Sequence, residues 1–170
     1  MAGIAGQPVS QERLREMLEY DPSNGAFYWK IRRAWAKAGS AAGSIGPNGY
    51  WRISINDRSI SSHRLAWLYM TGEWPTVGID HINSDKTDNA WTNLRLATPQ
   101  QQQFNQRISS RNTSGLKGVS KNAKNGLWRA DIMKNGKSKT IGYYDCRAAA
   151  SFSYQIEADK LFGSYARPVR

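Results

Sequence analysis

Ile79-Asp80-His81-Ile82-Asn83 carries the densest chemistry of this 170-residue chain. It sets a carboxylate beside an imidazole, and two amides follow, Asn93 twelve residues after the histidine and Gln102 nine residues further on. Carboxylate and amide oxygens are ligands that hard cations such as Mg²⁺ prefer. A neutral histidine can take a proton from water near neutral pH. The pattern therefore indicates a site that holds a cation next to a general base.

The residues around this stretch predict a strand, a loop, a second strand and a helix. Residues 77–82 form a short apolar run, and residues 94–97 can return as its partner. Thr98-Pro99 offers a hydroxyl cap and a proline at the first helical position, so a helix should continue over 100–107. Neighbours on a strand point to opposite faces. The carboxylate and the imidazole can share a site only if the strand is twisted or bulged, or if the cation and water approach around its end.

The residues before this motif predict a small α/β extension. Its expected elements are a helix over roughly 11–19 capped by Ser10, a strand over 26–30, strands over 50–55 and 58–61 with a turn at Asn56-Asp57, and a helix over roughly 63–71 ended by Gly72. His63 is expected to be a helix-start histidine with satisfied nitrogens. In the basic loop 31–49, Arg32 and Arg33 can contact phosphates, and a solvated basic loop is the alternative.

Three strands and one helix are expected after residue 112. The strands 117–121, 127–134 and 138–144 would be joined at Asn125-Gly126 and Asn135-Gly136, dipeptides typical of tight hairpin turns. Asp145 can cap a helix of roughly 146–162. This helix places Ala149, Phe152 and Ile156 on one face, as expected for a helix packed on the sheet.

The charge of the chain is +11 and unevenly distributed. Residues 1–103 carry 11 Lys and Arg against 9 Asp and Glu, whereas residues 104–170 carry 13 against 4, net charges of +2 and +9. A basic surface of this kind favours nucleic acid or an anionic membrane as partner. No apolar run approaches the ~20 residues of a membrane span. Cys146 is the single cysteine, which excludes an internal disulfide and favours a reducing, cytoplasmic setting.

Phosphodiester hydrolysis fits both the motif and the charge. The reaction needs a deprotonated water in line with phosphorus, and something that offsets charge on the phosphoryl and leaving oxygens. The imidazole suits the first task, and a cation held by oxygen ligands suits the second. The sequence therefore predicts a one-metal nuclease site in a DNA-binding chain.

Residues 79–105 resemble the HNH endonuclease motif, which has a ββα-metal fold, and the wider run 10–107 resembles phage and intron-associated HNH endonucleases, including His63-Arg64-Leu65-Ala66-Trp67. The resemblance implies Asp80 as metal ligand and His81 as general base. It implies that Asn93 ties the loop to the backbone and orients the imidazole. The second ligand falls at Gln102, where the family usually has asparagine, and Asn105, one turn away, is the alternative ligand.

Residues 112–166 resemble the plant ethylene-response-factor (Apetala-two) DNA-binding domain. The matching landmarks are Gly118-Val119, Trp128-Arg129-Ala130-Asp131-Ile132, Gly142-Tyr143-Tyr144-Asp145, Ala148-Ala149-Ala150, Tyr154 and Leu161-Phe162-Gly163. In that family the sheet lies in the major groove. The resemblance implies DNA contacts by Lys117, Lys121, Arg129, Lys139 and Tyr143. Ser120, Asn122 and Met133 stand where that family has arginine, so phosphate contacts by lysine are expected rather than base reading.

The sequence thus predicts an α+β chain. A ββα-metal HNH nuclease module with an N-terminal α/β extension (residues 1–108) is followed by a linker (109–114) and a DNA-binding module, a three-stranded antiparallel sheet packed on one helix (115–170). Mg²⁺ or Mn²⁺ is the expected cofactor, without a small-molecule cofactor. The expected partner is double-stranded DNA, not a membrane, and one site should nick one strand in a monomer or weak dimer. The resemblance places the chain in a phage-infected bacterial cytoplasm. The alternatives are a DNA-binding protein with a weakened nuclease site, and an RNA-directed nuclease.

Overall fold

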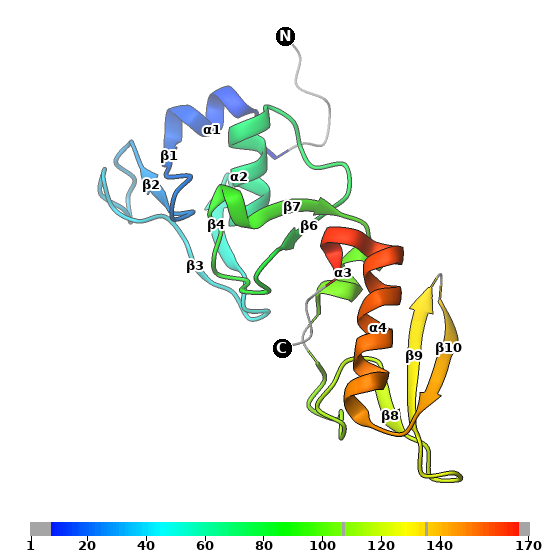
Figure 1. The fold of residues 1–170 in the computed structure, drawn as a ribbon. Coiled ribbons are helices and arrows are strands. Elements are labelled where there is room, and N and C mark those ends of the chain that lie inside the picture. Colours follow the sequence, from blue (N-terminus) through cyan, green and yellow to red (C-terminus); the bar gives the residue numbers. More distant parts are fainter. Residues whose placement is uncertain (1–7, 107, 135, 167–170) are drawn as a thin grey trace. The chain divides into compact units, whose positions relative to one another are not determined.

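The computed structural model describes residues 8–106, 108–134 and 136–166 (Figure 1). The chain is a mixed α+β protein and divides into two compact units, residues 1–97 and 98–170. The expected linker, residues 109–114, lies within the second unit. Each unit has its own hydrophobic core and is described separately.

The first unit begins with helix α1 (Gln11–Met17), whose Ser10 cap accepts a hydrogen bond from the Arg13 amide. The helix was expected to reach residue 19, but the chain is already extended at Leu18. Leu18–Tyr20 forms β1, which pairs antiparallel with β2 (Phe27–Trp29). This pairing buries Leu18 and Tyr20 on one side of β1, so a tertiary contact overrides the helical tendency of the segment.

A three-stranded sheet follows, with β4 (Trp51–Ile55) between β3 (Ser44–Ile45) and β5 (Arg58–Ser61). The expected two-residue turn at Asn56-Asp57 is confirmed. Both residues have positive φ, 49° and 59°, as a hairpin turn of the mirror-image type requires. Helix α2 (Ser62–Thr71) and its left-handed end at Gly72 are also as expected.

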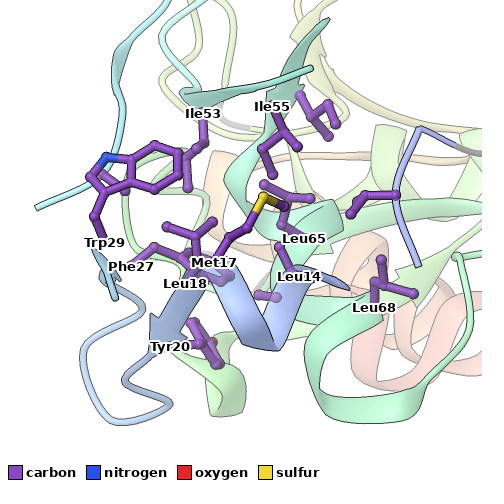
Figure 2. Close-up of a cluster of buried hydrophobic side chains, with 14 of the residues drawn as sticks. Leu14, Met17, Leu18, Tyr20, Phe27, Trp29, Ile53, Ile55, Leu65 and Leu68 are labelled. Atoms are coloured by element: carbon purple, nitrogen blue, oxygen red, sulfur yellow. The ribbon is translucent and has the colours of Figure 1, made fainter. Parts of the chain in front are cut away.

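The core of the first unit joins these elements. Figure 2 shows side chains from α1, β1, β2, β4 and α2 meeting around Met17 and Leu65, with Trp29 at one side. Trp29 is fully buried, whereas Trp35 is 63% exposed. Burial of large apolar side chains from helix and sheet together provides most of the driving force for this unit to fold.

The predicted strand–loop–strand–helix order is confirmed. β6 (Gly78–His81) pairs antiparallel with β7 (Leu94–Ala97), and the loop between them ends in a 3₁₀ turn, η1 (Trp91–Asn93). Helix α3 (Pro99–Asn105) opens the second unit and starts as predicted. The Thr98 hydroxyl accepts from the Gln101 amide, and the Gln101 side chain accepts from the Thr98 amide.

The second unit contains the expected three-stranded antiparallel sheet on one helix (Figure 1). Its strands are β8 (Val119–Lys121), β9 (Trp128–Lys134) and β10 (Lys137–Tyr144), with β9 central, and they are followed by α4 (Arg147–Phe162) and a 3₁₀ turn, η2 (Gly163–Tyr165). The connection at Asn125-Gly126 is wider than a two-residue turn, because its closing bonds join Asn122 to Leu127 and Gly126. Asn135 lies outside the described residues.

Two expectations for α4 are wrong. Its cap is Cys146 rather than Asp145, since the Cys146 sulfur accepts from the amide of Ala149. The expected face is not the buried one, because Phe152 is 69% exposed and Ile156 is 40% exposed.

The buried face of α4 consists of Ala150, Ser151, Tyr154 and Ala158. Small residues let the helix lie close to the sheet, where the Tyr154 ring covers Gly118. A Cβ at Gly118 would lie 2.2 Å from that ring, and this residue also has a φ of +68°. The face of α4 that packs on the sheet is therefore set by the close approach of the Tyr154 ring to Gly118, and not by the size of the apolar side chains.

Candidate active site

The carboxylate and the imidazole of the motif are both buried on β6. Asp80 is 9% exposed and His81 4% exposed, although neighbouring strand residues point to opposite faces. The strand is covered on both faces at this point, so each side chain has its own set of contacts. These contacts define what each group can do.

Asp80 forms a buried ion pair with Arg95, its cross-strand partner in the β6–β7 register. The guanidinium donates from Nε (2.9 Å) and from Nη2 (2.8 Å), and both bonds end on Oδ2 of the carboxylate. The two side chains are 10% and 15% exposed. The pair fixes the direction of the carboxylate and offsets its charge in a place that water hardly reaches.

His81 is oriented by Asn89, which lies in the β6–β7 loop. Nε2 of the imidazole is 3.1 Å from Oδ1 of Asn89. The Asn89 amide nitrogen donates to the carbonyl of Thr87, which assigns the carbonyl oxygen to the histidine. A carbonyl oxygen can only accept, so Nε2 carries the proton in the neutral ring. Nδ1 is then the basic nitrogen.

Asn93 ties the loop together. Its Oδ1 accepts from the amide of Asn83, and its Nδ2 donates to Oδ1 of Asn83 and to the carbonyl of Asp88. The carbonyl of Asn93 also accepts from the amide of Ile82. These bonds tie the loop to itself, whereas the hydrogen bond to the imidazole described above comes from Asn89.

A second histidine packs against His81. The His63 ring lies 5.2 Å from the His81 ring in an edge-on arrangement, and Tyr50 lies 5.1 Å from His63 and 5.8 Å from His81. His63 was expected to be satisfied by hydrogen bonds, but its buried Nδ1 has no partner among the described residues. Burial, with smaller contributions from His81, Arg64 and Arg52, lowers the pKa of His63 from its ordinary value of 6.5 to about 3. His63 is therefore neutral beside His81.

Both amides proposed as second ligands lie on α3 in the second unit. Gln102 is half-buried and Asn105 is 4% exposed, and a separation of three residues puts them on one side of the helix. The helix is held at its C-terminal end by Lys117, whose ammonium donates to the carbonyls of Phe104 and Gln106. The choice between the two amides stays a prediction.

The strand register divides the residues predicted to contact DNA. Arg129 is opposite Tyr143 and Ser120, on the face of the sheet turned away from α4. Lys121 is opposite Trp128, and Lys139 is opposite Ile132, so both lysines are on the helix side. The ammonium of Lys139 pairs there with Glu157 of α4.

The other predicted DNA contacts also differ in environment. Arg32 is exposed, whereas Arg33 is half-buried, with its guanidinium 4.5 Å above the Trp29 ring and donating to the sulfur of Met17. Lys117 is occupied at the end of α3, as described above. Their contacts with DNA stay predictions, as does every assigned role in the site.

Comparison with known proteins identifies the family. The model of an HNH endonuclease family matches residues 62–104, a range that includes both histidines and most of α3. An uncharacterized HNH endonuclease of Acanthamoeba polyphaga mimivirus is 33% identical over 146 residues, which cover 85% of this chain and 75% of that protein. Protein 3.8 of Escherichia phage T7 is 34% identical over 106 residues, 62% of this chain and 87% of that protein.

A solved structure is also similar to this chain. Its title is "DNA binding and cleavage by the HNH homing endonuclease I-HmuI". The two chains are 20% identical, and the match has a TM-score of 0.38 and covers 78% of this chain and 74% of that one. The sequence matches define a phosphodiesterase of the nuclease class. The chain belongs to the HNH endonuclease family. No helix in the described part of the chain is long and apolar enough to span a membrane.

HNH nucleases generally use a divalent metal ion, and the residues present fit one. Mg²⁺ binds through one or two carboxylates and keeps several waters or substrate phosphates as its other ligands. The buried carboxylate of Asp80 is a ligand of this chemical type. Residues 8–106, 108–134 and 136–166 contain no cluster of three or more His, Cys, Asp or Glu that could hold a metal.

Proposed function

We propose that this chain is a metal-dependent DNA endonuclease that nicks one strand at each active site. The observation that carries the proposal is the hydrogen bond between Nε2 of His81 and Oδ1 of Asn89. This bond favours the tautomer with the proton on Nε2, which makes Nδ1 the basic nitrogen, and the adjacent residue in the strand carries a buried carboxylate. A general base and an oxygen ligand for a hard cation are the two parts that phosphodiester hydrolysis needs.

The contacts support the following roles for the residues. Nδ1 of His81 takes a proton from the attacking water, and the hydrogen bond from Nε2 to Asn89 stabilises the imidazolium that results. Arg95 holds the Asp80 carboxylate in one direction, and Asn93 keeps the loop that carries Asn89 in place. The rings of His63 and Tyr50 pack against His81 and limit rotation of its side chain. A bound Mg²⁺ or Mn²⁺ would offset negative charge on the phosphoryl and leaving oxygens.

The second unit supplies DNA binding in this proposal. It carries a net charge of +9, against +2 for the first unit, and a surplus of this size favours binding to phosphates. We propose that the sheet face with Arg129, Tyr143 and Ser120 contacts duplex DNA, in keeping with the resemblance to the Apetala-two domain. The proposed modules are residues 1–108 and 115–170, joined by 109–114. One active site in a monomer or weak dimer gives a nick.

The test is conversion of supercoiled plasmid to open circles in Mg²⁺ or Mn²⁺, with EDTA as the metal-free control. His81→Ala should lower the rate by at least about 100-fold, because a general base contributes about 10² to 10⁴. Asp80→Asn should also remove cleavage. Asp145→Asn, which changes an exposed aspartate before α4, is the matched control and should cleave like the wild type. Equal cleavage by wild type and His81→Ala would contradict the proposal.

A DNA-binding protein with a weakened nuclease site is the second candidate. Two observations favour it: glutamine stands at position 102, and Arg95 already occupies Oδ2 of Asp80. Under this alternative, the wild type binds duplex DNA but cleaves no duplex in either metal. Gln102→Asn should then increase cleavage, because the shorter amide restores the usual ligand of the family.

A further inference from the structure

A polar groove on the first unit has no part in the proposed reaction. It has a volume of about 880 Å³, at the upper end of the range for ligand sites. Aromatic and basic side chains line one part of it, and serine hydroxyls line much of the remainder. The residues used below are Trp29, Arg33, Trp35, Arg52, Asp57 and Ser59.

Trp35 is held at a tight turn beside this groove. The amide of Arg33 donates to the carbonyl of Ala36 (2.8 Å), and the amide of Ala36 donates back to Arg33 (3.3 Å), so Ala34 and Trp35 form the turn. Trp35 is 63% exposed, and the centroid of its ring lies 5.3 Å from that of the buried Trp29, with the two rings nearly perpendicular. A large apolar ring on a closed turn loses little conformational freedom when it stacks on a ligand.

Positive charge lies next to the indole. The guanidinium of Arg33 is 4.5 Å from the Trp29 ring and 5.9 Å from the Trp35 ring, and its bond to the Met17 sulfur holds it there. Arg52 lines the groove as well, and its Nε donates to the hydroxyl of Ser59. The carboxylate of Asp57 is also in the lining, so a phosphate is favoured at the arginines and disfavoured near the β4–β5 turn.

We propose that this groove binds an unpaired nucleobase of the DNA substrate, with the base stacked on Trp35 and its phosphate near Arg33 and Arg52. Every base has a flat π-face, so an exposed indole accepts it without sequence preference. A paired base in a duplex does not offer that face without unstacking. The groove therefore favours DNA with a bulge, mismatch or opened step. The inference rests on the proposed function for the identity of the polymer, but binding is measured without cleavage.

The test compares a fully paired duplex with the same duplex carrying a central bulge that contains 2-aminopurine. Binding is measured by fluorescence anisotropy in EDTA with His81→Ala as the background, so a failure of the nuclease chemistry cannot hide or mimic the result. On this background, Trp35→Ala should bind the bulged duplex about fivefold or more weakly and the paired duplex equally well. Trp35→Phe should recover part of the loss. The emission of 2-aminopurine should be quenched by the tryptophan form and not by Trp35→Ala.

Phe152→Ala is the matched control, because Phe152 is 69% exposed on α4 in the other unit. It should leave binding of the bulged duplex unchanged. Unaltered binding of both duplexes by Trp35→Ala would overturn the proposal. An equal loss of affinity for both duplexes would also overturn it, because Trp35 would then contact paired DNA. Thermal unfolding of each variant checks that the exposed substitution leaves the fold intact.

Discussion

Each unit contains an arginine–aspartate ion pair of nearly the same length, in opposite environments. Arg95 and Asp80 are 2.8 Å apart with side chains 15% and 10% exposed, whereas Arg129 and Asp131 are 2.7 Å apart and 43% and 21% exposed. The first pair holds charge inside the protein, where a lost partner is costly. The second keeps charge at a surface that can exchange its partner for a phosphate. The ion pair of the first unit thus fixes a buried carboxylate in place, whereas that of the second unit leaves its arginine accessible at the surface.

The largest expected difference is in stability. Arg95→Met leaves the Asp80 carboxylate buried without its cation, and should lower the free energy of unfolding by about 3 to 5 kcal/mol. Arg129→Met breaks an exposed pair and should cost at most about 1 kcal/mol. Urea unfolding of the two variants measures both values. The double variant Arg95→Met with Asp80→Asn should regain part of the loss, and similar losses in the two single variants would contradict the comparison.

The second difference is in pH dependence. Unfolded His63 takes up a proton below its ordinary pKa of 6.5, but folded His63 does so only below a pKa of about 3. Between these values the unfolded chain binds more protons, so acid favours unfolding. The free energy of unfolding should fall by up to about 1.4 kcal/mol for each pH unit below 6.5.

The control for this prediction is His63→Phe, which keeps a flat ring beside His81 but cannot take up a proton. Its unfolding free energy should show a smaller pH dependence over the same range. An identical pH dependence in the two proteins would mean that His63 is not the group responsible. His63→Phe should also cleave DNA better than His63→Ala, since the ring and not its nitrogen is proposed to restrain His81.

The third difference separates orientation from binding. Asn89→Ala removes the acceptor that fixes the tautomer of His81, and should slow cleavage by about 10- to 100-fold, as loss of an orienting partner commonly does. Asn89→Asp keeps an acceptor and should slow cleavage less. Single-turnover rates report the effect, and binding to duplex DNA in EDTA should be unchanged. Weaker binding with an unchanged single-turnover rate would assign Asn89 to DNA contact instead.

The smallest expected difference concerns the two faces of the second sheet. Arg129→Ala should weaken binding to duplex DNA modestly, and reduce the slope of log affinity against log salt by about 0.9 for one lost phosphate contact. Lys139→Ala, on the helix side, should change neither quantity. If Lys139→Ala weakens binding and Arg129→Ala does not, DNA contacts the helix side of the sheet. That result would agree with the prediction from sequence that Lys139 contacts DNA.

The features predicted best from the sequence are those set by short runs of neighbouring residues. Thr98-Pro99 starts α3 as expected because a cap and a proline act within one turn, and Asn56-Asp57 turns between β4 and β5 because two residues adopt positive φ there. The Asp80-His81 pair was recognisable because its chemistry lies in adjacent residues. Structural features that depend on a few neighbouring residues can be predicted from one sequence.

Contacts between distant segments were missed. Arg95 meets Asp80 only because of the exact β6–β7 register, and His63 meets His81 only because α2 packs near β6. Asn89 had no signal beyond being an amide in a polar loop. The buried face of α4 was misjudged because Phe152 and Ile156 are large apolar side chains, whereas the buried residues include Ala150 and Tyr154, whose ring lies over Gly118.

The loop between β6 and β7 is held by hydrogen bonds from amide side chains, and amide side chains are chemically unstable over long times. Asparagine slowly hydrolyses to aspartate on heating or long storage, which replaces an NH₂ donor with a negative oxygen. At Asn93 this change removes the donor to the carbonyl of Asp88, and oxygen then faces oxygen. At Asn89 the same change leaves an acceptor for His81 but removes the donor to the carbonyl of Thr87. Hydrolysis of either amide should therefore loosen the loop between β6 and β7.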